Sequence, residues 1–390
     1  MAALEVRVLR SIAEIEGVRS TWLSWQGVPN SDLDFYLTVI TARPEFVRPH
    51  VIVLYRDNSP VAMLIGRVER RGLDLRLGYV KLFSPKVTML AFGYGGFLGS
   101  AASDGSDLMI RAVAKCLRDG EANVAFFNHL RADSALYYRI VTHPGLLTHD
   151  FFPSLQPHWR LLLPNSTDGL HSGMGRNTRK NHRSQANRLL KAFSGKVRIQ
   201  CFRAISELDR MIEDIEKIAV GTYQRSLGVG FVNSSEMRRH VYFEAEHGRF
   251  RGYILYVDEE PCAFWTGIVY AGTFHGELTG YDPKYADYSP GTFLTMRTLE
   301  DFCGKDRDDQ ITACDFGLGD ATYKRSLANQ EWLDAAVYLF APNLRGVSIN
   351  LVRTPFMAIG AASRRLLGET KLLSRTKTAW RNMVRMKQPT

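Results

Sequence analysis

The clearest chemical signal in the chain is a helix start in its second half, Ser289-Pro-Gly-Thr-Phe293. Serine and proline are common at the first positions of a helix, but a glycine directly after them weakens the start. A bare backbone at that point lets N–H groups approach an anion at the positive end of the helix. The segment therefore predicts either an anion-binding turn or a plain tight turn, and we favour the anion.

Side chains able to move protons lie on both sides of this turn. His275, Glu277 and Thr279 alternate along an apolar strand, so we expect them to face one side of a sheet. An imidazole or a carboxylate there can act as a general base, although a solvent-facing polar stripe has the same pattern. Asp315 ends another apolar strand in Asp315-Phe-Gly-Leu-Gly-Asp320. Its two glycines suit a tight turn into a helix at the carboxyl edge of the sheet, with Asp320 as an alternative helix cap.

Cationic side chains crowd one segment ahead of these strands. Residues 171–203 hold nine Lys or Arg and no acid. Spacings of three, four and seven place four of them on one helical face, namely Arg176, Arg179, Lys180 and Arg183. Such a face is commonly just solvated, but the lack of any acid favours a phosphate-bearing or polyanionic ligand.

The overall composition is that of a globular protein. The chain has 390 residues, enough for two domains, with 45% apolar and 23% charged residues. It contains no apolar run of membrane-spanning length and no signal-peptide core, so we expect a cytoplasmic protein. The five cysteines form no CxxC pair and no HExxH is present, so we expect no metal and no disulfide framework. Two basic segments, 171–203 and 345–390, indicate local anionic partners.

Two segments of the chain repeat each other. Aligned without a gap, residues 53–68 and 254–269 are identical at seven of 16 positions, including Tyr55/Tyr256 and Asp57/Asp258. Each reads as a β-hairpin, and each is followed by a Gly-containing turn, a helix, a strand and another helix. Duplication of one α+β domain with a mixed sheet explains both halves.

Three segments of the second half form a recognisable set. They are Arg176-Asn-Thr-Arg-Lys-Asn-His-Arg183, Tyr281-Asp-Pro-Lys-Tyr-Ala-Asp-Tyr-Ser-Pro-Gly291 and Asp315-Phe-Gly-Leu-Gly-Asp-Ala-Thr-Tyr-Lys-Arg325. With this order of elements, the chain resembles the GNAT acyltransferases, and its two halves resemble the FemAB-like transferases. The second half is most similar to the GNAT domain of CelD-type proteins, which are associated with cellulose and exopolysaccharide biosynthesis. Where the usual pyrophosphate loop carries Arg or Gln and spaced glycines, this chain has only Ser-Pro-Gly-Thr.

The resemblance implies an α+β fold of two tandem GNAT-like domains, residues 1–165 and 166–342, followed by a basic helical tail, 343–390. It implies acetyl-CoA or another acyl-CoA as the donor, held by backbone N–H groups of Ser289, Gly291, Thr292 and Phe293. The catalytic candidates are Glu277, His275, Asp315 and Tyr323, the last to protonate the leaving thiolate. The substrate-binding candidates are Arg176, Arg179, Lys180, Arg183, Asp320 and Lys324.

We therefore predict an acyltransferase, most simply an acetyl-CoA-dependent N- or O-acetyltransferase. Its acceptor would be sugar-containing or otherwise polar, in polysaccharide or cell-envelope biosynthesis. The first domain, a degenerate copy, would contribute the specificity for the acceptor, and the second would hold the donor. No cysteine or serine stands in a nucleophile motif, so we expect direct transfer. Two alternatives stay open: a FemAB-like aminoacyltransferase that uses charged tRNA, and a catalytically inactive binding module.

The basic tail has its own pattern. Leu373, Trp380, Met383 and Val384 fall loosely on one helical face among lysines and arginines. Such a segment can rest on anionic lipid headgroups at the inner face of a membrane, or it can cover the body of the protein.

Overall fold

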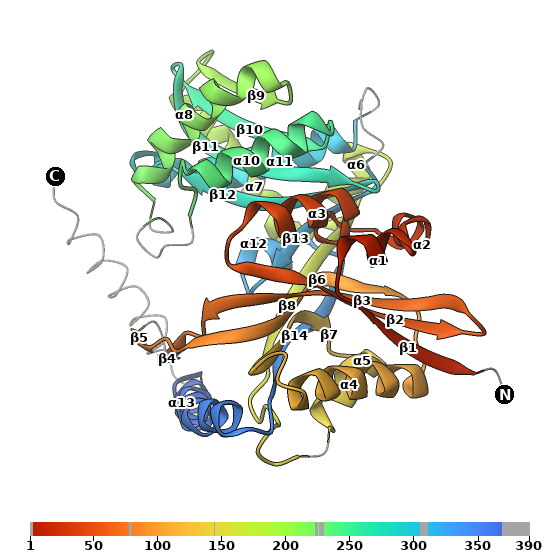
Figure 1. Cartoon of the computed structure of the whole chain (residues 1–390). Coiled ribbons are helices and arrows are strands. Elements are labelled where there is room, and N and C mark those ends of the chain that lie inside the picture. Colours follow the sequence, from red (N-terminus) through yellow and green to blue (C-terminus); the bar gives the residue numbers. More distant parts are fainter. Residues whose placement is uncertain are drawn as a thin grey trace. The chain divides into compact units, whose positions relative to one another are not determined.

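The computed structural model describes residues 3–77, 80–143, 145–222, 225, 230–304 and 311–368. The chain forms two compact units: residues up to Pro157 together with the segment that begins at Trp332, and His158–Glu331. Each unit is a mixed sheet with helices packed on it (Figure 1), which confirms the α+β class expected from the sequence. The tail positions Leu373, Trp380, Met383 and Val384 lie outside the described residues.

In the described part of the first unit, the sheet has six strands. Their spatial order is β1 (Leu4–Leu9), β2 (Phe46–Arg56), β3 (Ser59–Gly72), β6 (Lys86–Gly99), β7 (Val124–Arg131) and β14 (Gln330–Phe340). Neighbours run antiparallel except β6 and β7, which are parallel. The helices are α1 (Ile12–Glu16), α2 (Arg19–Trp25), α3 (Leu33–Ala42), α4 (Ser103–Arg118), α5 (Ala135–Val141) and α13 (Leu344–Gly368). The short strands β4 (Leu75–Leu77) and β5 (Val80–Phe83) pair separately.

The second unit follows the same plan. Its strands lie in the order β9 (Val197–Phe202), β10 (Phe250–Val257), β11 (Glu260–Tyr270), β12 (Thr273–Tyr281), β13 (Ala313–Leu318) and β8 (Ser154–Leu162). Again one neighbouring pair, β12 and β13, is parallel and the others are antiparallel. The helices are α6 (Thr167–Gly173), α7 (Arg176–Ala192), α8 (Leu208–Val220), α10 (Ser235–Glu246), α11 (Pro290–Phe302) and α12 (Thr322–Leu327), and the 3-10 helix η3 spans Pro283–Tyr288.

Each sheet takes its last strand from the other half of the sequence. β14 follows the second repeat but pairs with β7, and β8 follows the first repeat but pairs with β13. Relative to the boundaries expected after residues 165 and 342, most of β8 therefore belongs to the second unit and β14 to the first. A strand joins whichever sheet satisfies its backbone hydrogen bonds, so its place in the sequence does not decide its partner.

The repeated segments form equivalent hairpins. β2 and β3 turn at Asp57-Asn58, and β10 and β11 turn at the corresponding Asp258-Glu259. All four turn residues have positive φ, between 50 and 64°, as a two-residue type I′ turn requires. The register shift before the turn also recurs, between residues 54 and 55 and between residues 255 and 256. The two hairpins expected from the repeat are thus confirmed.

Different helices cover the two faces of the second sheet. Tyr253, Trp265 and Phe274 share one core cluster with side chains of α7 and α11. Ile254 and Phe264 lie in another cluster with side chains of α8 and α10. The face that a side chain on β12 takes therefore decides which helices it meets.

Candidate active site

The second unit contains a cavity of about 570 Å³. It lies at the end of β12, between the first turn of α11 and the helices α7 and α12. Most of the lining residues have a polar side chain, and the residues are Thr178, Asn181, His182, Gln185, Thr279, Gly280, Tyr281, Gly291, Thr292, Thr295, Thr322, Tyr323, Ser326 and Leu327. Of the candidates named from the sequence, the cavity brings together Gly291, Thr292 and Tyr323.

The first turn of α11 has two backbone N–H groups to spare. Ser289 takes a left-handed conformation, with φ of 52°, and its side chain does not cap the helix. Its N–H donates to the Ala286 carbonyl, and the N–H of Phe293 donates to the Ser289 carbonyl. The expectation that Ser289 and Phe293 offer N–H groups to a ligand is therefore wrong, because both groups are already bonded. Within the described residues the Gly291 and Thr292 N–H groups have no such bond, and both residues line the cavity.

The missing side chain of Gly291 keeps this turn open. A Cβ placed there would have only the Tyr281 ring for a neighbour, 3.6 Å away, so packing within the protein does not demand a glycine. What the glycine leaves clear is the approach to the helix N-terminus from the cavity. The helix also has no acidic residue in its first turn, so its positive end is not neutralised locally.

The expected alternation of His275, Glu277 and Thr279 is wrong, because β12 is bulged. Leu278 pairs with Thr266 and Gly276 pairs with Gly267, which leaves Glu277 as the extra residue. Thr279 lines the cavity, whereas the Glu277 carboxylate lies 2.9 Å from Nε2 of His240 on α10. Glu277 therefore belongs to the opposite face of the sheet from the cavity.

Asp315 organises two histidines on that opposite face. Its Oδ1 lies 2.7 Å from Nε2 of His158 and accepts the Gly317 N–H at 2.7 Å, while Oδ2 lies 3.7 Å from Nδ1 of His275. Burial raises the pKa of Asp315, but the His158 hydrogen bond and the two imidazoles outweigh burial and lower it overall. Asp315 is thus an anion that can orient His275.

His275 is left with one ring nitrogen to use. Its Nε2 is buried and has no hydrogen-bond partner among the described residues. Burial lowers the pKa of this imidazole, with the Asp315 charge acting the other way. His275 and Asp315 are also the last paired residues of β12 and β13, so the two strands part at this point. A neutral imidazole with a free nitrogen at the divergence of two strands is able to accept a proton.

Other predicted residues lie apart from the cavity. Asp320 is exposed and pairs with Arg325, while the N-cap of α12 is Ala321, so Asp320 does not cap that helix. The Lys324 ammonium donates to the Leu318 carbonyl at 2.7 Å, and burial lowers its pKa. Lys324 therefore holds the turn after β13 in shape.

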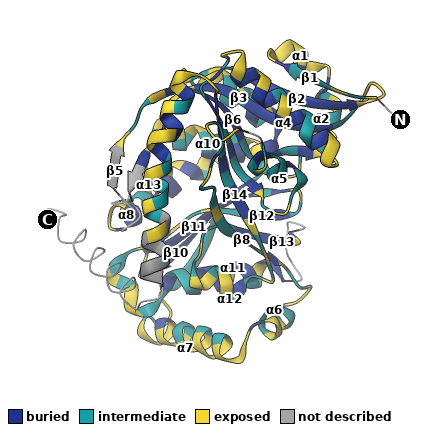
Figure 2. Cartoon of the chain, turned by 90° about the horizontal axis from the view of Figure 1, so that it is seen from below, coloured by how far each residue is buried: buried dark blue, intermediate teal, exposed yellow. Residues whose placement is uncertain are grey.

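The predicted cations of α7 and the polar residues of α7 that line the cavity are different side chains. The predicted cations Arg176, Arg179, Lys180 and Arg183 are all exposed, and Figure 2 shows much of α7 in the exposed colour. The cavity is lined instead by Thr178, Asn181, His182 and Gln185, which the sequence analysis did not single out. Their spacing of three, four and seven is the signal that would have found them. His182 Nδ1 and Gln185 Oε1 are buried without a hydrogen-bond partner in the described residues, which suits a polar ligand.

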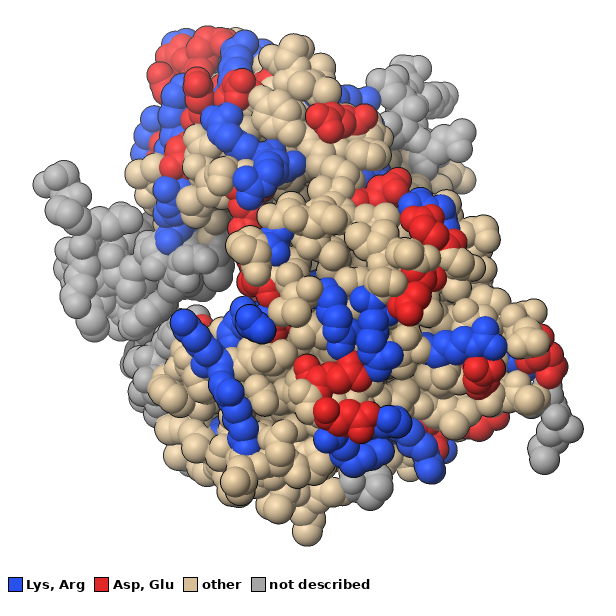
Figure 3. Space-filling view, viewed as in Figure 1, with Lys and Arg blue, Asp and Glu red and all other residues tan. Residues whose placement is uncertain are grey.

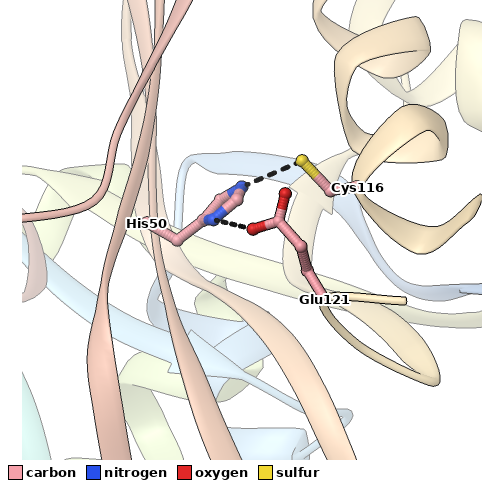
Figure 4. A group of neighbouring side chains, drawn as sticks. All are labelled: His50, Cys116 and Glu121. Carbon is pink, nitrogen blue, oxygen red and sulfur yellow. Dashed lines mark hydrogen bonds and ion pairs between the residues drawn. The ribbon is translucent and has the colours of Figure 1, made fainter. Parts of the chain in front are cut away.

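A second cluster lies in the first unit (Figure 4). His50 Nε2 is 3.7 Å from Cys116 Sγ, and His50 Nδ1 is 3.9 Å from the Glu121 carboxylate. These residue types bind metals, but Arg10 and Arg48 both hydrogen-bond to Glu121, and Arg48 also reaches His50 Nδ1 at 3.1 Å. Two guanidinium groups already balance the carboxylate. We interpret the cluster as a network that ties the end of α4 to β1 and β2.

Comparisons with known proteins agree with this geometry. Residues 176–325 match the model of the acetyltransferase (GNAT) domain family. A solved tandem GNAT protein from the clavulanic acid biosynthesis pathway is 10% identical and aligns over 86% of this chain and 98% of its own, with a TM-score of 0.51. The second unit thus carries a GNAT acetyltransferase domain, and the chain has a tandem GNAT fold.

More distant structures also align. FemX is 10% identical over 79% of this chain and 92% of its own, with a TM-score of 0.48. The C-terminal domain of a putative lysylphosphatidylglycerol synthetase from Agrobacterium fabrum is 9% identical over 76% of this chain and 85% of its own, with a TM-score of 0.44. Both lie too far away to carry an argument about function. A comparison with curated proteins gives no match.

Proposed function

We propose that the protein is a GNAT-type acyltransferase whose second unit transfers an acyl group from acyl-CoA to a polar amine or hydroxyl, since residues 176–325 match the GNAT acetyltransferase domain. The observation that carries this proposal is the pair of spare N–H groups at Gly291 and Thr292, which open into a cavity of about 570 Å³. A helix N-terminus with free N–H groups and no acidic residue in its first turn suits the pyrophosphate of such a donor.

The corresponding turn of the first unit is less suited to an anion. α4 follows β6 as α11 follows β12, but its first turn contains Asp104. The Asp104 carboxylate accepts the Gly105 N–H at 2.8 Å and so occupies one of the groups that an anion would need. A Cβ at Gly105 would also lie 2.6 Å from Leu54, so this glycine serves packing within the unit. These differences favour the second unit as the donor site.

The proposed chemistry is direct transfer. The acceptor nitrogen or oxygen attacks the thioester carbonyl carbon and the C–S bond breaks. His275 Nε2 takes the proton from the acceptor, and the Tyr323 hydroxyl protonates the leaving thiolate. Because β12 and β13 stop pairing at His275 and Asp315, a thioester held in the cavity can reach between the strands toward the histidine face.

The acceptor side favours a polar molecule. His240, Glu277 and His275 put imidazole and carboxylate groups on the face opposite the cavity. Such groups hydrogen-bond to hydroxyls and amines, which agrees with the sugar-containing acceptor that the CelD-type resemblance implies. We include polysaccharide or cell-envelope biosynthesis in the proposal on that resemblance alone.

A second candidate donor is a charged tRNA. The observation in its favour is the exposed cationic face of α7, formed by Arg176, Arg179, Lys180 and Arg183. On the face seen in Figure 3, basic and acidic residues are interspersed. This candidate predicts RNA binding that weakens steeply with salt and disappears when Arg179 and Arg183 are changed to Ser.

Thermal unfolding with a panel of CoA thioesters tests the donor site. A ligand at 100 times its dissociation constant adds about 2.7 kcal/mol to the free energy of unfolding. We expect this shift for the natural protein and for Gly27→Trp, whose exposed glycine has nothing within 4 Å, but not for Gly291→Trp. No shift with any thioester would overturn the proposal and turn attention to tRNA or an inactive module.

A further inference from the structure

We propose that α13 and the loop after α5 form a docking surface for an anionic phospholipid membrane. The surface consists of Leu146, Leu147, Leu344, Leu351, Val352 and Ile359. The surface belongs to the first unit and shares no residue with the proposed donor cavity. The docking proposal therefore does not rest on the acyltransferase proposal.

Large apolar side chains are unusually exposed on this surface. Leu344 is 92% exposed, Leu146 is 80% exposed and Leu351 is 59% exposed. Single exposed leucines are ordinary, but a contiguous apolar patch on a protein surface marks a site of association.

α13 has two opposite faces. Ile349 lies in a core cluster with residues of β6 and β14, and Asn350 and Arg353 are also buried. The exposed Leu344, Leu351 and Ile359 follow one another at spacings of seven and eight, which places them together on the far side of the helix. The helix is therefore amphipathic in the sense of an interfacial helix, with one face anchored to the protein.

Polar contacts hold the apolar loop against this helix. The Asn350 side-chain amide donates to the carbonyls of Leu147 at 3.0 Å and His149 at 2.9 Å. Arg353 forms a buried ion pair with Asp150 at 2.6 Å. These contacts fix the loop that carries the exposed Leu146 and Leu147 to α13.

The positive charge of α13 indicates which partner binds this surface. Residues 343–368 contain four arginines and no acid, and one of the four, Arg353, is buried in its ion pair with Asp150. A second copy of the chain would bring two such basic segments together, whereas an anionic membrane would gain about 1 kcal/mol for each cation near its surface. Among the described residues no helix has the length and apolarity to cross a bilayer, so the contact would be one of surface docking.

Vesicle co-sedimentation of the full chain tests the proposal. We expect binding to phosphatidylcholine vesicles that contain phosphatidylglycerol, about tenfold weaker binding to phosphatidylcholine alone, and weakening with added salt. Leu351→Glu with Ile359→Glu should lower binding about tenfold or more, since the charges face the lipid. Leu23→Glu on α2, where the leucine is 44% exposed outside the surface, is the matched control and should bind as the natural protein does.

Leu23, Leu351 and Ile359 are all exposed, so we expect both variants to fold. Thermal unfolding of each variant checks this. Absence of binding to anionic vesicles, or equal binding by the double variant, would overturn the proposal. So would light scattering that shows a dimer which the double variant abolishes, since the occupant would then be a second copy. No acyl donor or acceptor enters these measurements, so their outcome is separate from that of the donor test.

Discussion

Glu277 and Thr279 stand two residues apart on β12 but face opposite sides of the second sheet. Glu277 contacts His240 on α10, while Thr279 lines the cavity beside α7 and α11. Glycines on either side trace the change of face, since a Cβ at Gly276 would meet Trp265 and a Cβ at Gly280 would meet Phe264. One inserted residue thus separates a proposed donor site from a proposed acceptor site.

Replacing the proposed base should slow the chemical step and spare donor binding. We expect His275→Asn to lower kcat by about 10² to 10⁴, with the thermal shift caused by acyl-CoA unchanged. Because burial holds the pKa of His275 below 6.5, the acid limb of the natural protein's pH–rate profile should lie below pH 6.5. Glu277→Gln serves as the comparison. If that variant shows the larger loss and His275→Asn little, the base is Glu277.

The cavity tyrosine should matter to the leaving group. Tyr323→Phe removes the hydroxyl that would protonate the thiolate, so kcat should fall by about a hundredfold while the dissociation constant for the donor stays the same. Ser326→Ala is the matched control, because Ser326 also lines the cavity but its hydroxyl already donates to the Tyr323 carbonyl at 2.9 Å. Equal activity of Tyr323→Phe and the natural protein would remove this role.

Glu121 should make the first unit sensitive to acid. Hydrogen bonds from Arg10, with further help from other neighbours, lower the pKa of Glu121 to about 2 from its usual 4.5. A lowered folded-state pKa contributes stability that is full above pH 4.5 and is lost as the pH falls toward 2. Glu121→Gln should therefore cost about 1 to 3 kcal/mol of unfolding free energy at pH 7. Urea unfolding of both proteins should show the difference narrowing below pH 4.5, and a constant difference would contradict it.

Protonation of His50 should affect the stability of the protein at a higher pH than protonation of Glu121 does. Burial lowers the pKa of His50 to about 4 from 6.5, so the unfolded chain takes up a proton at a higher pH than the folded one. Stability should fall as the pH drops from 6.5 to 4. His50→Gln should flatten that part of the curve, as measured by urea unfolding at each pH.

A substitution in the turn of the second hairpin should raise the free energy of unfolding. Glu259 has a φ of 63° at a position where the first hairpin has Asn58, and left-handed backbone is unfavourable for most side chains. Glu259→Asn should raise the free energy of unfolding by up to about 1 kcal/mol, less any loss of the exposed pair with Arg198. Thermal unfolding measures the gain. Glu260→Asn, one residue past the turn, should give none.

Local patterns in the sequence carried over well to the structure. The strand expected to end at Asp315 continues to Leu318, but the hairpins and the helix that begins at Pro290 lie where propensity and turn chemistry place them. Backbone preference decides such features within a few residues, so no distant part of the chain is needed to predict them.

The site itself was only partly predictable. Gly291, Thr292 and Tyr323 do line the cavity, but the N–H groups of Ser289 and Phe293 are bonded elsewhere. The sequence of Ser289–Phe293 does not reveal these bonds. They arise because Ser289, in a left-handed conformation, is both the last cap residue of η3 and the N-cap of α11. On α7 the sequence pattern pointed to the cationic residues, whereas the cavity is lined by other polar residues of the same helix.

The residues alone determined a duplicated α+β fold and a helix start with a bare backbone, and the resemblance to the GNAT acyltransferases added the expectation of acyl transfer. Only the tertiary structure decided which sheet β8 and β14 join and on which side of β12 each polar residue lies. The physical reason is that propensity acts between neighbours in the chain. Strand exchange and a bulge depend on pairing with a distant strand, and a one-residue shift in that pairing moves every later side chain to the other face.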